Sequence, residues 1–177
     1  MSNLIRLIYA SKSTNPTEEN YGGIHVDVGR ILMQARNNNP KHQIGGVLYF
    51  GNNHFFQCLE GGQDVVNELY NTITEDPRHK NVQSLSVKRI SRRYFSNWSM
   101  KYVALEDDVT KLLKEHGYNS FMPYDFDDEF IEKMLKLFII ANDFSGSADQ
   151  NYDITRIPQR KLGFLSKLFR RRKTEPA

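Results

Sequence analysis

Two hydrophobic repeats alternate along the first hundred residues of the chain. Apolar residues recur at every second position, or run together, over 3–10, 45–51, 53–61, 82–90 and 98–104, which is typical of strands. Apolar residues at helical spacing predict helices over about 26–39 and 62–76, ended by Pro40 and Pro77. The resulting order is β-α-β-β-α-β with one extra strand, so we expect an α+β, ferredoxin-like sheet.

The pattern changes after residue 105. A short helix is predicted over 108–116, closed by Gly117, and an amphipathic helix over 127–144. We expect this C-terminal helical pair to pack on the sheet. Residues 145–159 are polar and predict a linker, and residues 162–173 place apolar side chains beside a basic cluster. The expected organisation is a domain of residues 1–105, a helical extension of residues 106–144, and a linker with a basic amphipathic tail over residues 145–177.

A polar side chain interrupts an otherwise apolar strand face at Gln57. Side chains alternate between the two faces of a strand, so Phe55, Gln57 and Leu59 share one face. An unpaired buried amide costs about 1–3 kcal/mol for each group left without a partner. Gln57 must therefore meet a backbone carbonyl, a core side chain or a bound ligand with a polar edge. Tyr9 has a similar position in the first strand and would pair with Gln57 if both strands belong to one sheet.

Charge is unevenly distributed along the chain. The formal net charge is +3, but eight Lys or Arg and one Glu lie from Arg156 onward, which leaves residues 1–155 at −4. We therefore expect no direct nucleic-acid binding by the main domain. The tail combines an apolar face with a cationic end, which suits an anionic membrane or an acidic partner. A helix packed on its own domain explains the tail equally well.

Several functional classes are disfavoured by composition and spacing. Cys58 is the single cysteine, so we expect no internal disulfide and a reducing cytoplasmic setting. We expect no signal peptide and no membrane span, because no run approaches about 20 apolar residues. The histidines are not spaced as zinc ligands, and phosphate-binding glycine motifs are absent from the sequence. Glu60 and Asp76 are interpreted as isolated carboxylates, solvated at the ends of a strand and a helix, so no enzymatic acid–base pair is expected.

Three short motifs have both a structural and a functional explanation. The Asn-Asn-Asn-Pro segment at 37–40 suits a helix C-cap with a left-handed Asn, or a functional amide. The Asp-Pro-Arg-His segment at 76–79 suits a helix exit, or contact with a phosphate-bearing ligand. Trp98 and Met100 share one strand face, which suits core packing as well as a site.

Together these motifs resemble the BLUF family, blue-light receptors that bind flavin. The resemblance rests on Arg-Leu-Ile-Tyr at 6–9, the segment 36–40, Gly-Gly-Val-Leu-Tyr at 45–49, Phe-Phe-Gln-Cys-Leu-Glu-Gly at 55–61, the segment 76–79, and Phe95 followed by Trp-Ser-Met at 98–100. The family uses a ferredoxin-like sheet with the flavin between two helices. The likeness is to short stand-alone bacterial members of the Acinetobacter type, rather than to fusions with cyclases or phosphodiesterases. The loop at 11–23 is longer than is usual in the family, and the basic tail is not part of the family pattern.

The resemblance implies a role for each matching residue. Tyr9 would donate an electron and a proton to the excited flavin ring, and Gln57 would bridge Tyr9 and the ring and change its hydrogen bonding after light. Ile31 and Ile73 would sandwich the ring, with Asn39 at its carbonyl edge. The residues implied to bind FAD, or alternatively FMN, are Tyr9, Ile31, Asn38, Asn39, Gln57, Ile73, Arg78 and His79. The implied photoactive residues are Tyr9, Gln57, Trp98 and Met100, the last two as transmitters of the change.

The implied function is a non-enzymatic blue-light photoreceptor that binds flavin non-covalently. Its signal would arise from rearranged hydrogen bonds among Tyr9, Gln57 and the flavin. The signal would reach a partner protein, such as a transcriptional regulator, or change a homo-oligomer. The alternative is a ferredoxin-like protein-interaction module without a chromophore, and the colour of the purified protein would separate the two.

Overall fold

A five-stranded mixed sheet forms the centre of the protein, with strand order β6-β1-β5-β4-β7. The computed structural model describes residues 3–15, 20–21, 24–96 and 99–144. Neighbouring strands are antiparallel except for β4 and β7, which are parallel. The strands are β1 (Leu4–Ser13), β4 (Gly45–Gly51), β5 (His54–Gly62), β6 (His79–Arg89) and β7 (Lys101–Tyr102), with a separate small pair of β2 (Asn20–Tyr21) and β3 (Ile24–His25). The predicted ferredoxin-like α+β class is confirmed.

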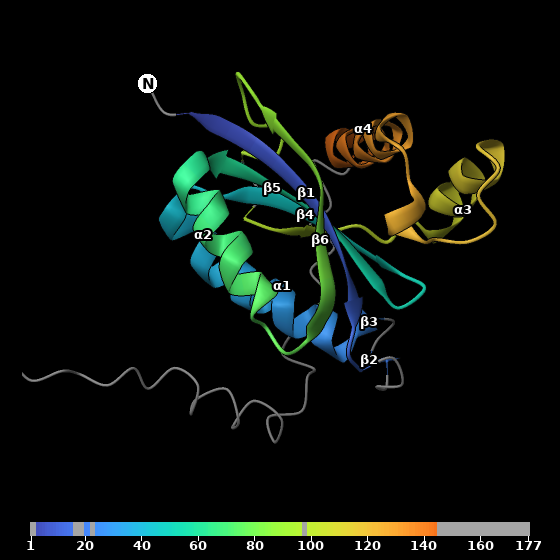
Figure 1. Ribbon diagram of the computed structural model, residues 1–177, viewed down its shortest axis with the longest axis horizontal. Helices are drawn as coiled ribbons and strands as arrows, with labels where there is room; N and C mark the ends of the chain where they lie inside the picture. Colours follow the sequence, from blue (N-terminus) through green and yellow to red (C-terminus); the bar gives the residue numbers. More distant parts are fainter. Residues whose placement is uncertain (1–2, 16–19, 22–23, 97–98, 145–177) are drawn as a thin grey trace, which may run out of the picture.

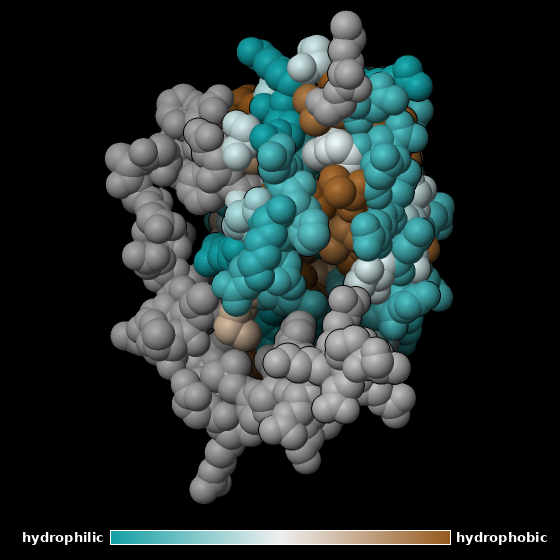
Figure 2. All heavy atoms as spheres, turned by 90° about the vertical axis from the view of Figure 1, so that its left-hand side faces the viewer, coloured by the Kyte–Doolittle hydropathy of each residue, from teal (hydrophilic) through white to brown (hydrophobic). Residues whose placement is uncertain are grey.

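The helices cover both faces of this sheet. Helices α1 and α2 lie on one face, and α4 lies on the other (Figure 1). Helix α1 continues into a short 3-10 helix, and a second 3-10 turn precedes α4. The bounds are α1 (Val26–Asn38), η1 (Asn39–His42), α2 (Gln63–Thr74), α3 (Glu106–Glu115), η2 (Pro123–Asp125) and α4 (Asp128–Phe144). Figure 2, seen from the left of Figure 1, shows a hydrophobic strip between hydrophilic residues.

The core under α1 and α2 follows from strand alternation. Odd-numbered residues of β1 and β5 point to this face, and the apolar stripes of the two helices close over them. The buried members from the strands are Ile5, Leu7, Tyr9, Leu48, Phe55 and Leu59, and those from the helices are Val28, Ile31, Leu32 and Val66. This is the face on which Gln57 lies.

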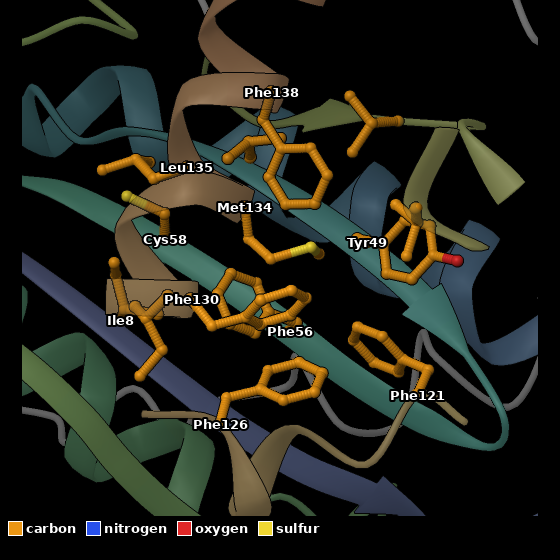
Figure 3. Packing of buried hydrophobic residues seen from close by; sticks show 14 of the residues in the cluster. Ile8, Tyr49, Phe56, Cys58, Phe121, Phe126, Phe130, Met134, Leu135 and Phe138 are labelled. Carbon is orange, nitrogen blue, oxygen red and sulfur yellow. The ribbon is translucent and has the colours of Figure 1, made fainter. Parts of the chain in front are cut away.

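The opposite face carries a second, largely aromatic core. Phe130, Met134 and Phe138 of α4 lie over Phe56 and its neighbours on the sheet (Figure 3). Phe121 and Phe126 approach from the segment before α4, at ring distances of 6.4 Å from Phe56 to Phe121 and 4.6 Å from Phe126 to Phe130. Cys58 is buried here, on the other side of the strand from Gln57. The predicted packing of the C-terminal helices on the sheet is thus seen, with Val109 and Leu113 of α3 in the same core.

A buried ion pair also lies on the α4 side of the sheet. Arg6 and Glu60 are cross-strand partners, and Arg6 Nε donates to Glu60 Oε1 over 2.7 Å. Glu60 is fully buried, and its other oxygen accepts from the backbone N–H groups of Tyr94 (2.7 Å) and Phe95 (3.0 Å). The interpretation of Glu60 as a solvated carboxylate is wrong. The charge of Glu60 is buried because the guanidinium of Arg6 and two backbone N–H groups replace the hydrogen bonds that water would make.

The ends of several elements differ from the expectation. A left-handed Asn was one explanation of the 37–40 segment. The left-handed residue at the end of η1 is instead Gln43 (φ 55°), whereas Asn39 keeps a right-handed helical conformation (φ −58°, ψ −37°). Pro40 is accommodated in the first turn of η1, where its missing N–H is not needed. The last strand covers only Lys101–Tyr102, rather than the whole of 98–104. The expected roles of Trp98 and of the tail after residue 144 fall outside the described residues.

Truncating one buried and one exposed side chain of α4 should show how much the aromatic core contributes to stability. Phe138 is fully buried, so Phe138→Ala is expected to lower the free energy of unfolding by about 3–5 kcal/mol. Ile140 is 54% exposed on the same helix, so Ile140→Ala should change it by less than about 0.5 kcal/mol. Urea unfolding followed by circular dichroism measures both. Equal stability of the two variants would show that α4 does not contribute to the core as described.

Candidate functional site

A pocket lies between α1 and α2, above the sheet face that carries Tyr9 and Gln57. It is a cleft that opens to solvent, and side chains of both helices and of the sheet line it.

One stripe of each helix forms the two side walls. Helix α1 contributes Ile31, Gln34, Ala35 and Asn38, and the α2 side contributes Leu69, Thr72, Ile73 and Asp76. Both sets follow the spacing i, i+3, i+4, i+7 of a single helix face. Gln34, Thr72 and Leu69 were not identified as site residues from the sequence. Counting in helical steps from Ile31 reaches Gln34, and counting from Ile73 reaches Leu69 and Thr72. This spacing was the signal that could have identified the three residues.

Tyr9 and Gln57 form the polar part of the pocket floor. They are directly opposite each other on β1 and β5, and they are 0% and 2% exposed. Tyr9 Oη donates a short hydrogen bond to Gln57 Oε1. The ring of Tyr70 packs edge-on against Tyr9 at 5.6 Å. Burial raises the pKa of Tyr9 far above its usual value, so its hydroxyl keeps the proton at any ordinary pH.

The other end of the Gln57 amide meets Met100. Gln57 Nε2 donates to Met100 Sδ over 3.4 Å, and Met100 is 1% exposed. Gly46 makes this approach possible, because a Cβ there would lie 2.3 Å from the Cys58 carbonyl oxygen and 3.1 Å from Met100 Cε. Sulfur is a weak acceptor. Gln57 is therefore held strongly at its oxygen and weakly at its nitrogen.

Asn39 connects the end of α1 to the segment before β7. It is 3% exposed, and its Nδ2 donates to the Ser99 carbonyl over 2.6 Å. Arg36 Nε donates to the Met100 carbonyl over 3.2 Å. A side-chain amide has two N–H donors, so Asn39 has a second donor for a group in the pocket that it lines. Asn38 lines the pocket beside it.

Charged groups lie where α2 leads into β6. Arg78 Nε donates to Asp76 over 2.9 Å, and Arg78 Nη2 reaches Gln34 Oε1 on α1 over 2.7 Å. Burial alone would raise the pKa of Asp76, but hydrogen bonds from Arg78 hold it below its usual value. Asp76 is thus ion-paired rather than isolated, which corrects the expectation. Burial lowers the pKa of His79 to about 4, and its Nδ1 lies 2.7 Å from Ser11 Oγ.

The structure brings together most of the residues singled out in the sequence. Eight of them line this pocket: Tyr9, Ile31, Asn38, Asn39, Gln57, Ile73, Arg78 and His79. Met100 lies behind the floor, in contact with Gln57. Trp98 is outside the described residues.

These residues fit a flavin. The isoalloxazine ring is flat and apolar on its faces and carries carbonyl and nitrogen groups along its edge. The pocket offers Ile31 and Ile73 on opposite helices for the faces, and the amides of Asn38, Asn39 and Gln57 for the edge. Arg78 adds a cationic side chain to the lining.

The described residues show neither a metal cluster nor a membrane-spanning helix. Among the described residues, no cluster of three or more His, Cys, Asp or Glu side chains is arranged to hold a metal ion. None of the helices in the described ranges has the length and apolar character needed to cross a membrane.

Solved structures with similar folds include proteins whose descriptions refer to a photo-activated or a dark state. The protein is similar to BlsA of Acinetobacter in its photo-activated state, with 35% sequence identity, a TM-score of 0.70, and coverage of 77% of this chain and 95% of that one. It matches the BlsA ground state with the same identity and TM-score. BlrB, described as a BLUF protein, shares the fold at 24% identity and a TM-score of 0.63.

Curated relatives contain the same kind of domain within longer proteins. The chain is 30% identical over 122 residues to the blue light- and temperature-regulated antirepressor BluF of Escherichia coli K12, covering 67% of this chain and 30% of that protein. It is 34% identical over 98 residues to the photoactivated adenylate cyclase subunit beta of Euglena gracilis, which is 11% of that protein. The chain thus spans less than a third of these relatives.

A family model described as sensors of blue-light using FAD matches residues 4–101, which include all the pocket residues named above. The match covers more than half of the chain, and the protein therefore belongs to the BLUF family of flavin-binding blue-light sensors.

Proposed function

We propose that this protein senses blue light through flavin bound between α1 and α2, and that Tyr9 and Gln57 form the switch. The observation that carries the proposal is the buried hydrogen bond between these two side chains at the pocket floor. When bound, the flavin supplies absorption of blue light and a ring that accepts an electron in its excited state. The protein supplies the orientation, the exclusion of water and the response.

The binding roles follow from where each group lies. Ile31 and Ile73 hold the ring by its faces, and Asn39, with Asn38 beside it, donates to the carbonyl edge. Arg78 and His79 lie towards the ring edge or the phosphate-bearing side chain. Because His79 is neutral at physiological pH, Arg78 is the cation of this pair. FAD is the flavin named for the family. FMN would make the same contacts as FAD as far as its phosphate group.

Tyr9 acts as a coupled donor of an electron and a proton. A phenolate at this position is strongly disfavoured, because the side chain is fully buried. Loss of the proton alone is therefore costly, whereas loss of a proton together with an electron leaves no net charge. Gln57 lies at the hydroxyl and is positioned to pass the proton on and to return it.

Gln57 is suited to two arrangements of similar energy. Its carbonyl accepts from Tyr9, and its NH₂ meets only the weak sulfur acceptor of Met100. A tyrosine hydroxyl both donates and accepts, so a rotated or tautomeric amide keeps a bond to Tyr9. The rotation frees the NH₂ from Met100 at little cost. A small change of this kind biases a bistable element rather than breaking the fold.

The output is proposed to be an interaction rather than a reaction. Met100, with Trp98 beside it in the sequence, would carry the change into the helices of residues 106–144, while residues 1–105 hold the flavin. The partner would be a protein such as a transcriptional regulator, in line with the word antirepressor in the name of the Escherichia coli relative. A change of homo-oligomer is the second form of output. The expected reducing, cytoplasmic setting belongs to the same proposal.

Removing either member of the switch should abolish the light response but not flavin binding. Tyr9→Phe removes the phenol proton, and Gln57→Leu removes the amide, while both roughly preserve volume. We expect each purified variant to be yellow and to lack the small reversible red shift that blue light produces in the wild-type protein. Absorption spectra before and after illumination measure this.

Tyr49→Phe is the matched control for the switch variants, because Tyr49 is buried on the opposite face of the sheet. It should keep the red shift. A normal light-minus-dark spectrum in Tyr9→Phe or Gln57→Leu would refute the assigned roles.

Asn39 is expected to contribute to affinity instead. Asn39→Ala removes a buried donor at the pocket, which should weaken flavin binding by about 0.5–1.5 kcal/mol, or roughly 2- to 10-fold in Kd. Asn37→Ala serves as the control, since Asn37 is exposed and does not line the pocket. Titration of the apoprotein with FAD, followed by quenching of flavin fluorescence, gives both values. The role of Asn39 would be excluded if the two variants bound FAD equally well.

A further inference from the structure

A dense group of cations spans the last two residues of β6 and the turn that follows. Four of the six residues from Lys88 to Arg93 are Lys or Arg, although residues 1–155 carry a net charge of −4. Figure 1 shows that the loop after β6 projects at the end of the sheet where β1 begins. A positive surface at this corner therefore stands out from a mildly acidic domain.

Three of these four cations have no acidic partner among the described residues. Lys88 is paired with Glu132 at 2.7 Å, and Arg93 donates to the Gln43 carbonyl. Arg89 and Arg92 are exposed, and neither takes part in an ion pair within the described ranges. Their guanidinium groups are thus available to a ligand.

An exposed aromatic ring lies beside them. Tyr94 is 43% exposed, and the guanidinium of Arg6 lies 4.8 Å and that of Arg92 5.5 Å from its ring centroid. Arg6 is itself fixed by its buried bond to Glu60. These cation–π contacts favour this position of the ring.

The backbone of this surface is also fixed. Glu60 accepts from the N–H groups of Tyr94 and Phe95, and the Ile90 N–H donates to the Leu4 carbonyl over 3.0 Å. Phe95, next to Tyr94, is fully buried in the core. A surface ordered in advance loses less entropy on binding than a mobile loop.

We propose that Arg89, Arg92 and Tyr94 form the docking surface for an acidic segment of a partner protein, and that light changes its affinity. Guanidinium groups bind carboxylates in a planar, two-point geometry, and Tyr and Arg are the residues enriched in the energetic centres of protein interfaces. A nucleic-acid duplex fits less well, because its charges, about one per 1.7 Å, would extend over the acidic remainder of the domain. This inference rests on the proposed function, since the segment belongs to the receptor's output partner.

The link to light runs through β5. Gln57 contacts Met100, and Glu60, three residues later on the same strand, holds Tyr94 and Phe95. Side chains of β5 thus contact both Tyr94 and Met100. A change at Gln57 acts on the strand that also holds the docking surface.

The test uses the full chain with flavin bound and a fluorescein-labelled peptide of ten glutamates as the probe. Fluorescence anisotropy measures binding in the dark and under blue light, at low and at physiological salt. The double variant Arg89→Gln/Arg92→Gln should weaken binding at least tenfold, and Tyr94→Ala should weaken it further. The control Lys111→Gln/Lys114→Gln removes the same charge from exposed positions of α3 and should change binding less than twofold.

Other outcomes would overturn the proposal. Equal losses in the two double variants would show a general charge effect. If peptide binding is lost only when Arg170, Arg171 and Arg172 are changed to Gln, the tail binds the peptide. Tighter binding of a DNA duplex through Arg89 and Arg92 would change the class of partner, and equal peptide affinity in light and dark would exclude control by light.

The light-minus-dark spectrum of each variant separates this proposal from the proposed function. If the wild-type protein shows no red shift, the proposed function fails whatever the peptide does. If the spectra are normal and Arg89→Gln/Arg92→Gln binds the peptide like the wild type, only the docking surface fails.

Discussion

The burial of a phenol and an amide on an apolar sheet face is the constraint on which the site depends. Neither Tyr9 nor Gln57 has access to water, so each must be satisfied inside the protein. Antiparallel pairing of β1 and β5 places them directly opposite each other, and the hydroxyl meets the amide oxygen. One donor on Gln57 remains poorly satisfied, because it faces only a sulfur atom. A core with one weak hydrogen bond beside a ligand pocket is stable yet can be rearranged.

Strand alternation lets one strand serve two purposes. On β5, Gln57 faces the pocket, whereas Glu60 and Cys58 face α4. Glu60 holds the chain after β6 with charge-assisted hydrogen bonds, which are about twice as strong as neutral ones. Gln57 holds the same chain farther on with a weak contact to Met100. Side chains of one strand therefore contact the chain after β6 at two places, beside Tyr94 and beside the pocket.

Local pattern was enough for the order of the main elements and for the central pair, but the segment at 11–23, expected to be a loop, also holds the end of β1 and the strand β2, which pairs with β3. Tyr9 and Gln57 follow from the two-residue repeat of their strands, and the walls of the pocket follow from helical spacing. Glu60 was misjudged because its burial depends on Arg6, which is 54 positions away in the sequence. Asp76 differs, because its partner Arg78 is only two positions away, and Arg78 in turn contacts Gln34 of α1. Charged groups are placed by tertiary partners, which the hydrophobic pattern does not specify.

The length of β7 shows the same limit and bears on the mechanism. Hydrophobic pattern predicted a strand over 98–104, but the ladder with β4 covers only Lys101 and Tyr102. Before it, Ser99 and Met100 are held instead by side chains of the pocket region, through Asn39 and Arg36 to their carbonyls and through Gln57 to the sulfur. A full backbone ladder would tie this segment to β4 independently of the ligand. Side-chain bonds from the pocket make its position depend on what the pocket holds, which is what a sensor requires of the segment next to its switch.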